Sequence, residues 1–335
     1  MKLKILAFLA SLGSLLSCSS NKLDIDVSGI SVPLDIKRFD RAIASLDKSS
    51  PSAGVLAVAR DYPAFIELYN VNIIKVGSMY NAEYPQRLKL FLAYDVFDEI
   101  NIQVAKEFGT GVDTLMSMLE PAFKHYRFYF PGKPIPTIYT FNGGFNQSIV
   151  IDSAVLGIGL DKYLGTGNAL YKMLEMEQFK KAGMVPGRVA PDCMQAVFES
   201  EFPFNFSTEN LLSTMISDGR KMYFVKAMIP GIADTTLWGF SSSQMEFCNS
   251  YESNMWNYLV DNKLLFDSDY MNIRRFTSEG PFTSAFSKES PARAASWVGF
   301  RIVSSFMEHN PAVGLNDLLA ETDYQKIMNK AKYNP

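Results

Sequence analysis

Thr137-Ile138-Tyr139-Thr140-Phe141-Asn142-Gly143-Gly144 is the stretch that decides the fold class. Its first five residues are β-branched or aromatic, as is typical of a strand, and Asn142-Gly143-Gly144 is a turn signal. β character resumes from Gln147 to Ile151, so the stretch predicts a β-hairpin. The next segment carries Gly157 and Gly159, which permit close backbone approach. They do not form a dinucleotide-binding motif, because no third glycine follows at the required spacing.

Helical periodicity dominates on both sides of this hairpin. Apolar residues recur at spacings of three and four, the pattern of amphipathic helices. The helices predicted in the C-terminal half span Pro191–Phe202, Glu209–Ile229, Ser241–Phe266, Ala292–Met307 and Leu315–Lys332. Near the N-terminus, Ile30, Val32, Leu34 and Ile36 alternate with other residues and predict an edge strand. The predicted fold class is therefore mainly α with a small β-sheet (α+β). Residues 36–335 are expected to form a single helix-rich domain, because no linker or repeat interrupts them.

Two tryptophans are expected in the core of the C-terminal half. Ser241–Phe266 and Ala292–Met307 each carry a broad apolar face at helical spacing. Trp256 lies in the first segment and Trp297 in the second, so the two helices are predicted to pack together with both indoles largely buried. The alternative is that Trp256 lies on a binding surface.

The first 17 residues, MKLKILAFLASLGSLLS, have the pattern of a bacterial lipoprotein signal peptide. Lys2 and Lys4 precede a short apolar run, and a small residue then stands before Cys18. The run is too short to span a bilayer permanently. The sequence predicts a signal peptide at residues 1–17, acylation of the Cys18 thiol and a lipidated tether at residues 18–35. The alternative is an ordinary cleaved signal with an incidental cysteine.

The composition limits the classes of function. The 335 residues carry a net charge of −3 with acids and bases well mixed, so no basic stripe predicts nucleic-acid binding. Cys193 and Cys248 either pair in an oxidising compartment or stay as buried thiols, and their apolar context favours the thiols. His125 and His309 are expected to be solvated or capping residues at helix ends.

Motifs of the common catalytic and metal sites are missing from the sequence. The chain has no G-x-S-x-G, H-E-x-x-H, C-x-x-C or phosphate-binding loop, and its two histidines lie far apart. We therefore expect neither a metal nor a cofactor. Carboxylates are still able to form an acid–base pair or to bind a hard cation. The candidates are Asp152, Asp161, Asp192, Glu199, Glu201 and Asp218.

An ordered set of motifs along the mature chain resembles one protein family. The motifs are Leu23-Asp24-Ile25-Asp26-Val27, Ile36-Lys37-Arg38-Phe39-Asp40, Phe141-Asn142-Gly143-Gly144, Gly157–Gly165, Asp218–Phe224, Met228-Ile229-Pro230, Glu252 with Trp256-Asn257-Tyr258, Gly280–Thr283, Ser290–Arg293, Trp297-Val298-Gly299 and Lys332–Pro335. Together they resemble the gliding motility lipoprotein GldB family of the Bacteroidetes. The resemblance implies a lipoprotein of the outer membrane or envelope that gliding requires, in a phylum where gliding is tied to type IX secretion.

The family is in turn similar to predicted zinc peptidases that carry H-E-x-x-H on a helix, with a hairpin before it and a Glu-Gly after it. Here the corresponding helix holds Cys193–Phe198 without histidines, and Asp218-Gly219 stands at the Glu-Gly position. The resemblance thus implies a zincin-like, peptidase-like scaffold without a metal site, because one carboxylate cannot hold zinc. Its hairpin is expected opposite the Pro191 helix, across a cleft whose candidate residues are Asn142, Gly143, Gly144, Asp161, Asp192, Glu199 and Asp218.

Two functions follow from these interpretations. The first is a non-catalytic lipoprotein, anchored to the membrane through Cys18, that binds envelope protein partners such as gliding or type IX secretion components, and no nucleic acid. Ser19-Ser20-Asn21-Lys22 lacks an acidic run for surface export, which favours the outer membrane with the protein facing the periplasm. The second is an envelope hydrolase that acts on peptide or cell-wall material through carboxylates. Convergence of several carboxylates in one cleft would favour it.

Overall fold

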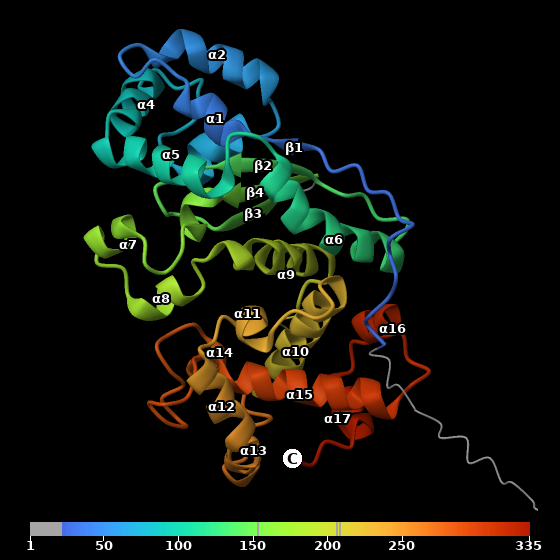
Figure 1. The fold of residues 1–335 in the computed structure, drawn as a ribbon. Coiled ribbons are helices and arrows are strands. Elements are labelled where there is room, and N and C mark those ends of the chain that lie inside the picture. The colour runs from blue at the N-terminus through green and yellow to red at the C-terminus, as the bar shows by residue number, and fades with distance from the viewer. Residues whose placement is uncertain (1–21, 153, 206, 208) are drawn as a thin grey trace, which may run out of the picture.

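The computed structural model describes residues 22–152, 154–205, 207 and 209–335 (Figure 1). Helices account for most of them, and four short strands form a small sheet, which confirms the predicted mainly α, α+β fold class. Cys18 and the predicted signal peptide lie outside the described residues. Among the described residues, no helix combines the length and the apolar character needed to cross a membrane.

The sheet has the strand order β1-β2-β4-β3. Its strands are β1 Ile36–Lys37, β2 Thr137–Phe141, β3 Ile149–Asp152 and β4 Val155–Gly159. β2 pairs in parallel with β1 and β4, whereas β3 pairs antiparallel with β4 and forms an edge. The hairpin is therefore β3–β4. The predicted hairpin, which joined β2 to β3 through Asn142-Gly143-Gly144, is wrong.

Two glycines explain why β4 takes the place between β2 and β3. A Cβ atom on Gly157 would lie 2.9 Å from Cε2 of Phe65, and one on Gly159 would lie 2.2 Å from the carbonyl oxygen of Gln147. A strand with side chains at these positions would not fit beneath the aromatic ring and beside the start of β3. The turn after β2 does not fold back onto β2, and Gly144 and Phe145 both adopt a left-handed backbone there, with φ of 64° and 65°.

The segment before β1 follows the predicted alternation. Val32 and Leu34 are buried, whereas Ser31, Pro33 and Asp35 are exposed. Only Ile36–Lys37 is paired as a strand, since Pro33 has no N–H to donate to a neighbour. Leu23 is buried in the same core as Val32 and Leu34, so residues 23–34 of the predicted tether pack along the body of the protein.

An aromatic core covers one face of the sheet. It is formed by α1 Phe39–Ala44, α2 Pro51–Asp61, α3 Ile66–Leu68, the π-helical turn η1 Tyr69–Ile73, α4 Tyr84–Leu92 and the start of α5 Asp95–Phe108, packed on Tyr139 and Phe141 of β2 (Figure 1). Phe39 is its centre, because its ring lies edge-on to Phe65 and Tyr69 with centroids 5.0 and 4.9 Å apart.

A second, larger core lies on the other face. Ile138, Leu156 and Ile158 point into it and join residues of α6 Asp113–Tyr129 and α9 Val189–Glu201. Between β4 and α9 lie four short helices, η2 Leu160–Tyr163, α7 Ala169–Met173, α8 Gln178–Ala182 and η3 Pro186–Arg188. After α9 come α10 Leu211–Met228, α11 Asp234–Trp238, α12 Ser242–Ser250, α13 Glu252–Asp261, α14 Tyr270–Thr277, α15 Ala294–His309, α16 Leu315–Ala320 and α17 Tyr324–Ala331.

Helices α10 and α15 cross in direct backbone contact. A Cβ atom on Gly299 would lie 1.8 Å from the carbonyl oxygen of Met215, and one on Gly219 would lie 2.4 Å from the carbonyl oxygen of Gly299. The two glycines therefore fix where these helices meet, because any side chain at either position would push them apart.

The predicted C-terminal helices are interrupted. Ser241–Phe266 is two helices, α12 and α13, separated at Tyr251, and Leu315–Lys332 is likewise divided into α16 and α17. The break at Tyr251 resets the helical phase, so Trp256 does not continue the apolar stripe of α12. Trp256 is half-buried, with its ring edge-on to Tyr333 at 5.3 Å between centroids. Trp256 still packs against the main core, and Trp297 is 2% exposed, so the predicted burial is complete for Trp297 and partial for Trp256.

The structure also shows the environments of the cysteines and histidines for which the sequence made predictions. Cys193 and Cys248 are free, buried thiols, the alternative that the sequence favoured. His125 is buried within α6, where its Nδ1 lies 2.9 Å from the carbonyl oxygen of Pro121, so the prediction of a solvated residue at a helix end is wrong. His309 is exposed and ends α15, as expected.

Candidate functional site

The seven predicted cleft residues fall into two groups. Asn142, Gly143, Gly144 and Asp161 lie together at the carboxyl ends of β2 and β4, and Asp192, Glu199 and Asp218 lie on α9 and α10. The first group lines none of the larger cavities found among the described residues. The predicted wall of the cleft is instead formed by the start of β3.

In the group at the sheet end, Asn142, Gly143 and Asp161 are buried and only Gly144 is exposed. Asp161 is 0% exposed, and its Oδ2 accepts hydrogen bonds from the backbone N–H groups of Gly143 at 2.9 Å and Phe145 at 2.8 Å. The Asn142 side chain donates to Asn101 Oδ1, and its backbone carbonyl accepts the Tyr69 hydroxyl. These contacts hold the left-handed turn in place, so the group positions the backbone and does not present chemistry to a ligand.

Burial makes Asp161 an unusual acid. Desolvation raises its pKa from 3.8 to about 6, although the backbone N–H groups of Phe145 and Gly143 and the nearby Lys162 oppose the shift. Its Oδ1 is buried and has no hydrogen-bond partner among the described residues. The protonated and the ionised forms of the Asp161 carboxyl group are therefore both populated at pH values near 6.

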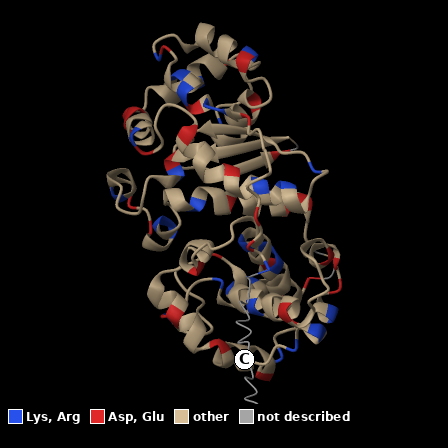
Figure 2. Ribbon diagram, turned by 45° about the vertical axis from the view of Figure 1, so that its right-hand side comes forward, with Lys and Arg blue, Asp and Glu red and all other residues tan. Residues whose placement is uncertain are grey.

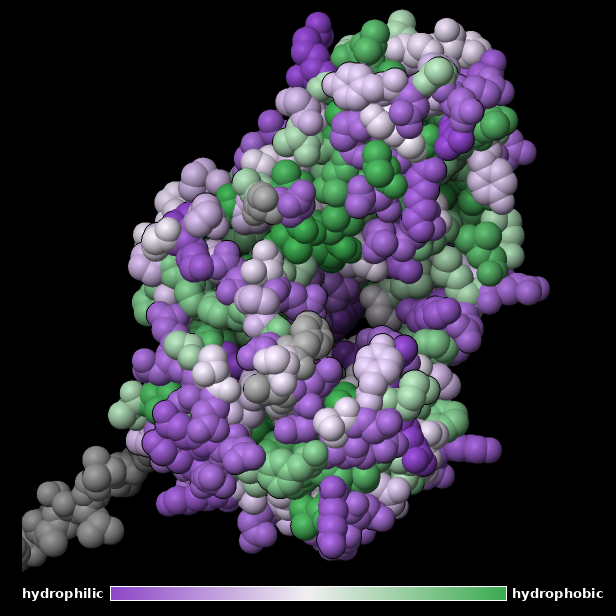
Figure 3. Space-filling view, turned by 180° about the vertical axis from the view of Figure 1, so that it is seen from behind, coloured by the Kyte–Doolittle hydropathy of each residue, from purple (hydrophilic) through white to green (hydrophobic). Residues whose placement is uncertain are grey.

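A cavity of about 500 Å³ lies between β3, η2 and α8 on one side and α9, the end of α11 and the loop between α14 and α15 on the other. The surface seen from behind is hollowed in the middle of the molecule, and hydrophilic residues surround the hollow (Figure 3). Most of its lining side chains are polar or charged. The lining includes Ser148, Ile149, Lys162, Tyr163, Lys180, Arg188, Asp192, Gln195, Glu199, Trp238, Glu279 and Arg293.

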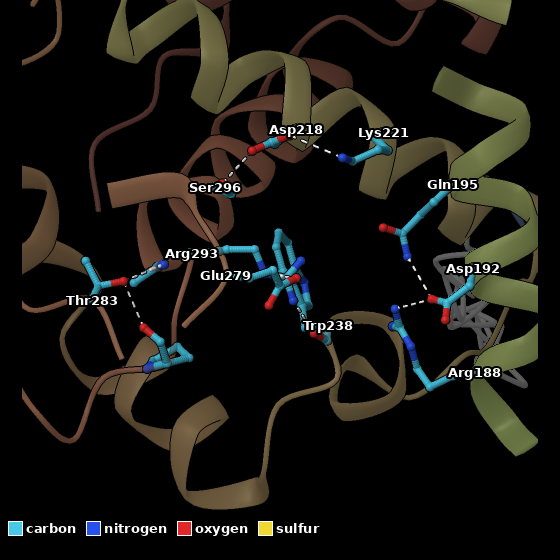
Figure 4. A network of polar contacts seen from close by, with 12 residues as sticks. Arg188, Asp192, Gln195, Asp218, Lys221, Trp238, Glu279, Thr283, Arg293 and Ser296 are labelled. Carbon is cyan, nitrogen blue, oxygen red and sulfur yellow. Dashed lines mark hydrogen bonds and ion pairs between the residues drawn. The ribbon is translucent and has the colours of Figure 1, made fainter. Parts of the chain in front are cut away.

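Arg188 and Asp192 form a buried ion pair at the start of α9 (Figure 4). The other terminal nitrogen of Arg188, Nη1, donates to the carbonyl oxygens of Thr236 and Leu237, each at 2.6 Å. Asp192 also accepts the Tyr163 hydroxyl at 2.9 Å. Burial raises the pKa of Asp192 although Arg188 lowers it, and 21% of its side chain remains exposed. This acid therefore reaches the cavity.

Arg293 approaches the cavity from the opposite side (Figure 4). Its backbone is left-handed, with φ of 58°, at the N-cap of α15. Its Nη2 donates to the Trp238 carbonyl at 2.9 Å, and its Nε lies 3.0 Å from Glu279 Oε1. The guanidinium group lies over the rings of Trp238 and Phe240, at 5.9 and 5.7 Å from their centroids, which is within the range of cation–π attraction.

Lys221 on α10 joins the two remaining predicted acids. Its Nζ lies 3.0 Å from Glu199 and 3.4 Å from Asp218, and Asp218 also accepts the Ser296 hydroxyl at 2.6 Å (Figure 4). Burial lowers the pKa of Lys221, but Asp218 and Glu199 outweigh burial and the net shift is upward. Lys221 is thus held as a cation between two carboxylates and is not available as a base.

A second cavity of about 1010 Å³ adjoins the first, and Arg188 and Gly239 line both. Its lining is rich in neutral polar side chains from α12, among them Ser243, Gln244 and Ser250. It contains none of the predicted site residues. We take the smaller cavity as the candidate site, because it brings together the charged groups.

Sequence reasoning identified Asp192 and Glu199 in the lining of this site and missed Glu279 and the basic residues. Lys162, Arg188 and Arg293 were not among the predicted residues, although Arg188 lies four residues before Asp192, a spacing that places both on one helix face. Arg293 belongs to the quoted Ser290–Arg293 motif, but nothing in that motif shows that it faces α9. Among the described residues, no three His, Cys, Asp or Glu side chains are arranged to hold a metal.

The fold and site define a class: an α+β protein in which a polar cavity with paired charges lies between a small mixed sheet and a helical C-terminal half. Acidic and basic residues are mixed over the molecule (Figure 2).

The family described as the gliding motility protein GldB matches residues 20–335. The chain therefore belongs to the GldB family of gliding motility lipoproteins, which confirms the resemblance found in the sequence. No curated protein and no solved structure matches the chain.

Proposed function

We propose that this protein is a non-catalytic lipoprotein of the cell envelope that binds protein partners, among them components of the gliding or type IX secretion machinery. Membership of the GldB family supports the role in gliding. The observation that carries the non-catalytic part is the pairing of charges in the cavity. Asp192, Glu199 and Glu279 each form an ion pair, with Arg188, Lys221 and Arg293 respectively.

Paired carboxylates are poor acid–base catalysts. A general acid needs a raised pKa and a general base needs access to its proton donor. Lys221 pairs with both Glu199 and Asp218, so neither of these carboxylates is free to act as an acid or a base. The resemblance to zinc peptidases supports a cleft between β3 and α9, retained for binding without catalysis.

The anchor is the lipid on Cys18, and the proposed location is the outer membrane with the body in the periplasm. Partner binding is tested by crosslinking in living cells followed by mass spectrometry, with Cys18→Ala as the matched unanchored variant. We expect the wild-type protein to incorporate labelled fatty acid and to crosslink to envelope proteins, and Cys18→Ala to lose the label and most crosslinks. Equal labelling of the wild type and Cys18→Ala would show that Cys18 does not carry the lipid. The absence of any reproducible envelope partner in the crosslinking experiment would contradict the binding role.

A hydrolase is the second candidate, and one observation favours it. Asp192 lines the cavity, has a raised pKa and hydrogen bonds with Tyr163, as a proton donor does in some active sites. Hydrolysis of peptide or cell-wall fragments by the purified protein, lost in Asp192→Asn, would establish this function instead of the first.

A further inference from the structure

All but one of the charged side chains that line the cavity form ion pairs. Arg188 pairs with Asp192, Arg293 with Glu279, and Lys180 with Glu177. Glu199 is neutralised by Lys221. Lys162, on η2, lines the same cavity and makes no hydrogen bond or ion pair with any of the described residues. Lys162 is therefore the lining cation without an ion-pair partner among the described residues, although the buried Asp161 carboxylate lies near enough to raise its pKa.

The surroundings of Lys162 disfavour its charge. Its side chain is half-buried, and burial lowers the pKa of its ammonium group. Asp161 opposes this shift, and the Lys180 ammonium adds to it. An anion in the cavity would relieve both the desolvation and the repulsion from Lys180.

Two buried donors beside the cavity also lack acceptors among the described residues. They are Nε of Arg188 and Nε1 of Trp238. A buried N–H group without a partner costs roughly 1–3 kcal/mol. The lining is therefore short of acceptors, which again favours a ligand that carries oxygen atoms with negative charge.

The edge of β3 leads into this cavity. Gly159 donates to the Ser148 carbonyl, and β3 and β4 are antiparallel with Val150 opposite Gly157. In such a ladder, alternate residues point their N–H and C=O groups away from the partner strand. On β3 these residues are Ile149 and Ile151. Both are half-exposed, and Ile149 lines the cavity.

We propose that this cavity binds the carboxylate of an extended peptide segment, whose main chain pairs with the free edge of β3 and whose carboxylate contacts Lys162. The proposal rests on the partner-binding function and names the part of the partner that is recognised. Main-chain pairing with an exposed sheet edge provides affinity, and a pocket at its end provides specificity.

The charge count selects a carboxylate over a phosphate. Only Lys162 among the lining cations lacks an ion-pair partner in the described residues, and a carboxylate supplies one negative charge to it, whereas a phosphate monoester carries about two near neutral pH. Arg188 and Arg293 keep their own acidic partners, so a doubly charged group would remain partly uncompensated.

The experiment uses three pools of random hexapeptides and the full-length protein in detergent. The first pool lacks Asp and Glu and is amidated at the C-terminus, so it has no carboxylate. The second lacks Asp and Glu but has a free C-terminus, and the third is amidated but contains Asp. Retention of the second pool alone identifies a C-terminal carboxylate, and retention of the third identifies a side chain. A charge-assisted hydrogen bond is worth 1.5–3 kcal/mol, so retention should exceed that of the first pool by about tenfold or more.

Two variants test the two contacts. Lys162→Met should reduce retention of the carboxylate pools to the level of the first pool, whereas Lys172→Met, an exposed lysine on α7 outside the cavity, should leave it unchanged. Ile151→Pro removes an outward N–H without removing a ladder bond and should weaken every pool. Melting curves of each variant show that it is folded.

Equal retention of the three pools, no retention of any pool, or wild-type retention by Lys162→Met would overturn the proposal. Competition by millimolar inorganic phosphate but not by acetate would overturn the choice of carboxylate. If crosslinks to envelope partners in cells persist in Lys162→Met while peptide retention fails, the proposed function stands and this site assignment alone is wrong.

Discussion

Asp161 and Asp192 are two buried acids whose pKa burial raises, yet they lie in regions of opposite character. Asp161 is fully buried at the sheet end, forms no ion pair with any of the described residues and accepts two backbone N–H groups. Asp192 pairs with Arg188 and keeps a fifth of its side chain exposed to the cavity. The sequence grouped them in one cleft, but the structure separates a closed structural site from an open one.

The difference teaches that residue type does not decide the role of a buried carboxyl group. What decides it is whether the group reaches space that a ligand can enter, and whether a cation neutralises it locally. Asp161 accepts hydrogen bonds from two backbone N–H groups and thereby stabilises the turn after β2. Asp192 is part of the charged lining of a cavity with space for a ligand.

The largest expected effect in this comparison is that of Arg188→Met. The substitution strands Asp192 in a buried position and removes the donor from the Thr236 and Leu237 carbonyls. Breaking a buried ion pair costs about 3–5 kcal/mol. Urea unfolding should show this loss. Lys180→Met in the same cavity breaks an exposed pair and should cost less than about 1 kcal/mol. Equal effects would mean that the Arg188 pair contributes no more than a surface pair.

The next largest effect should be a difference between the wild type and Asp161→Asn in how the free energy of unfolding depends on pH. The folded pKa of about 6 lies above the unfolded value of 3.8, so the folded state binds more protons between these values. The free energy of unfolding of the wild type should therefore fall as the pH rises from about 4 to about 6. A shift of about two units corresponds to roughly 3 kcal/mol.

An amide at position 161 still accepts both N–H groups and cannot ionise. Relative to the wild type, Asp161→Asn should therefore gain stability between pH 4 and pH 7, by an amount approaching that figure. Urea unfolding at several pH values measures it. Asp192→Asn loses the ion pair with Arg188 and should be less stable than the wild type at every pH, and the pH-dependent part of its change should be smaller, because Arg188 offsets the burial of Asp192. Parallel curves for the wild type and Asp161→Asn would contradict the role given to burial.

Lys162→Met should have the smallest effect on stability, within about 0.5 kcal/mol of the wild type, as for surface substitutions away from paired groups. Lys162 has no partner to lose among the described residues, and removing a half-buried charge relieves desolvation. Thermal melting without ligand measures this, with Lys221→Met as a contrast that loses two ion pairs. A large loss for Lys162→Met would show that its ammonium group has a structural partner.

Helices were predictable from the sequence because their spacing is local. The positions of α9, α10 and α15 agree with the prediction to within about two residues. The break at Tyr251 carries no glycine or proline and was missed. Strand order was not predictable, because the parallel pairing of Ile36 with Ile138 and of Phe141 with Gly159 joins distant segments whose register no local turn sets.

The site was predictable only where its residues share one element. Asp192 and Glu199 lie on α9 and were predicted together, and both line the cavity. Arg293 donates a hydrogen bond to the Trp238 carbonyl, and the two residues lie 55 positions apart in the sequence. Lys162 reaches the cavity because η2 directly follows β4. Such contacts come from the packing of the helices, in which Gly219 and Gly299 set the crossing of α10 and α15.

The packed N-terminal segment has a mechanical consequence. Only five peptide steps separate Cys18 from buried Leu23, a span of at most about 18 Å when fully extended. With a lipid on Cys18, as we propose, the body of the protein would stay close to the lipid surface. A force on the body would then pass through the packed residues 23–35 to β1, where Ile36 and Lys37 pair with Ile138 and Tyr139 of β2. Under that proposal, the small sheet would bear the force between the anchor and the rest of the protein.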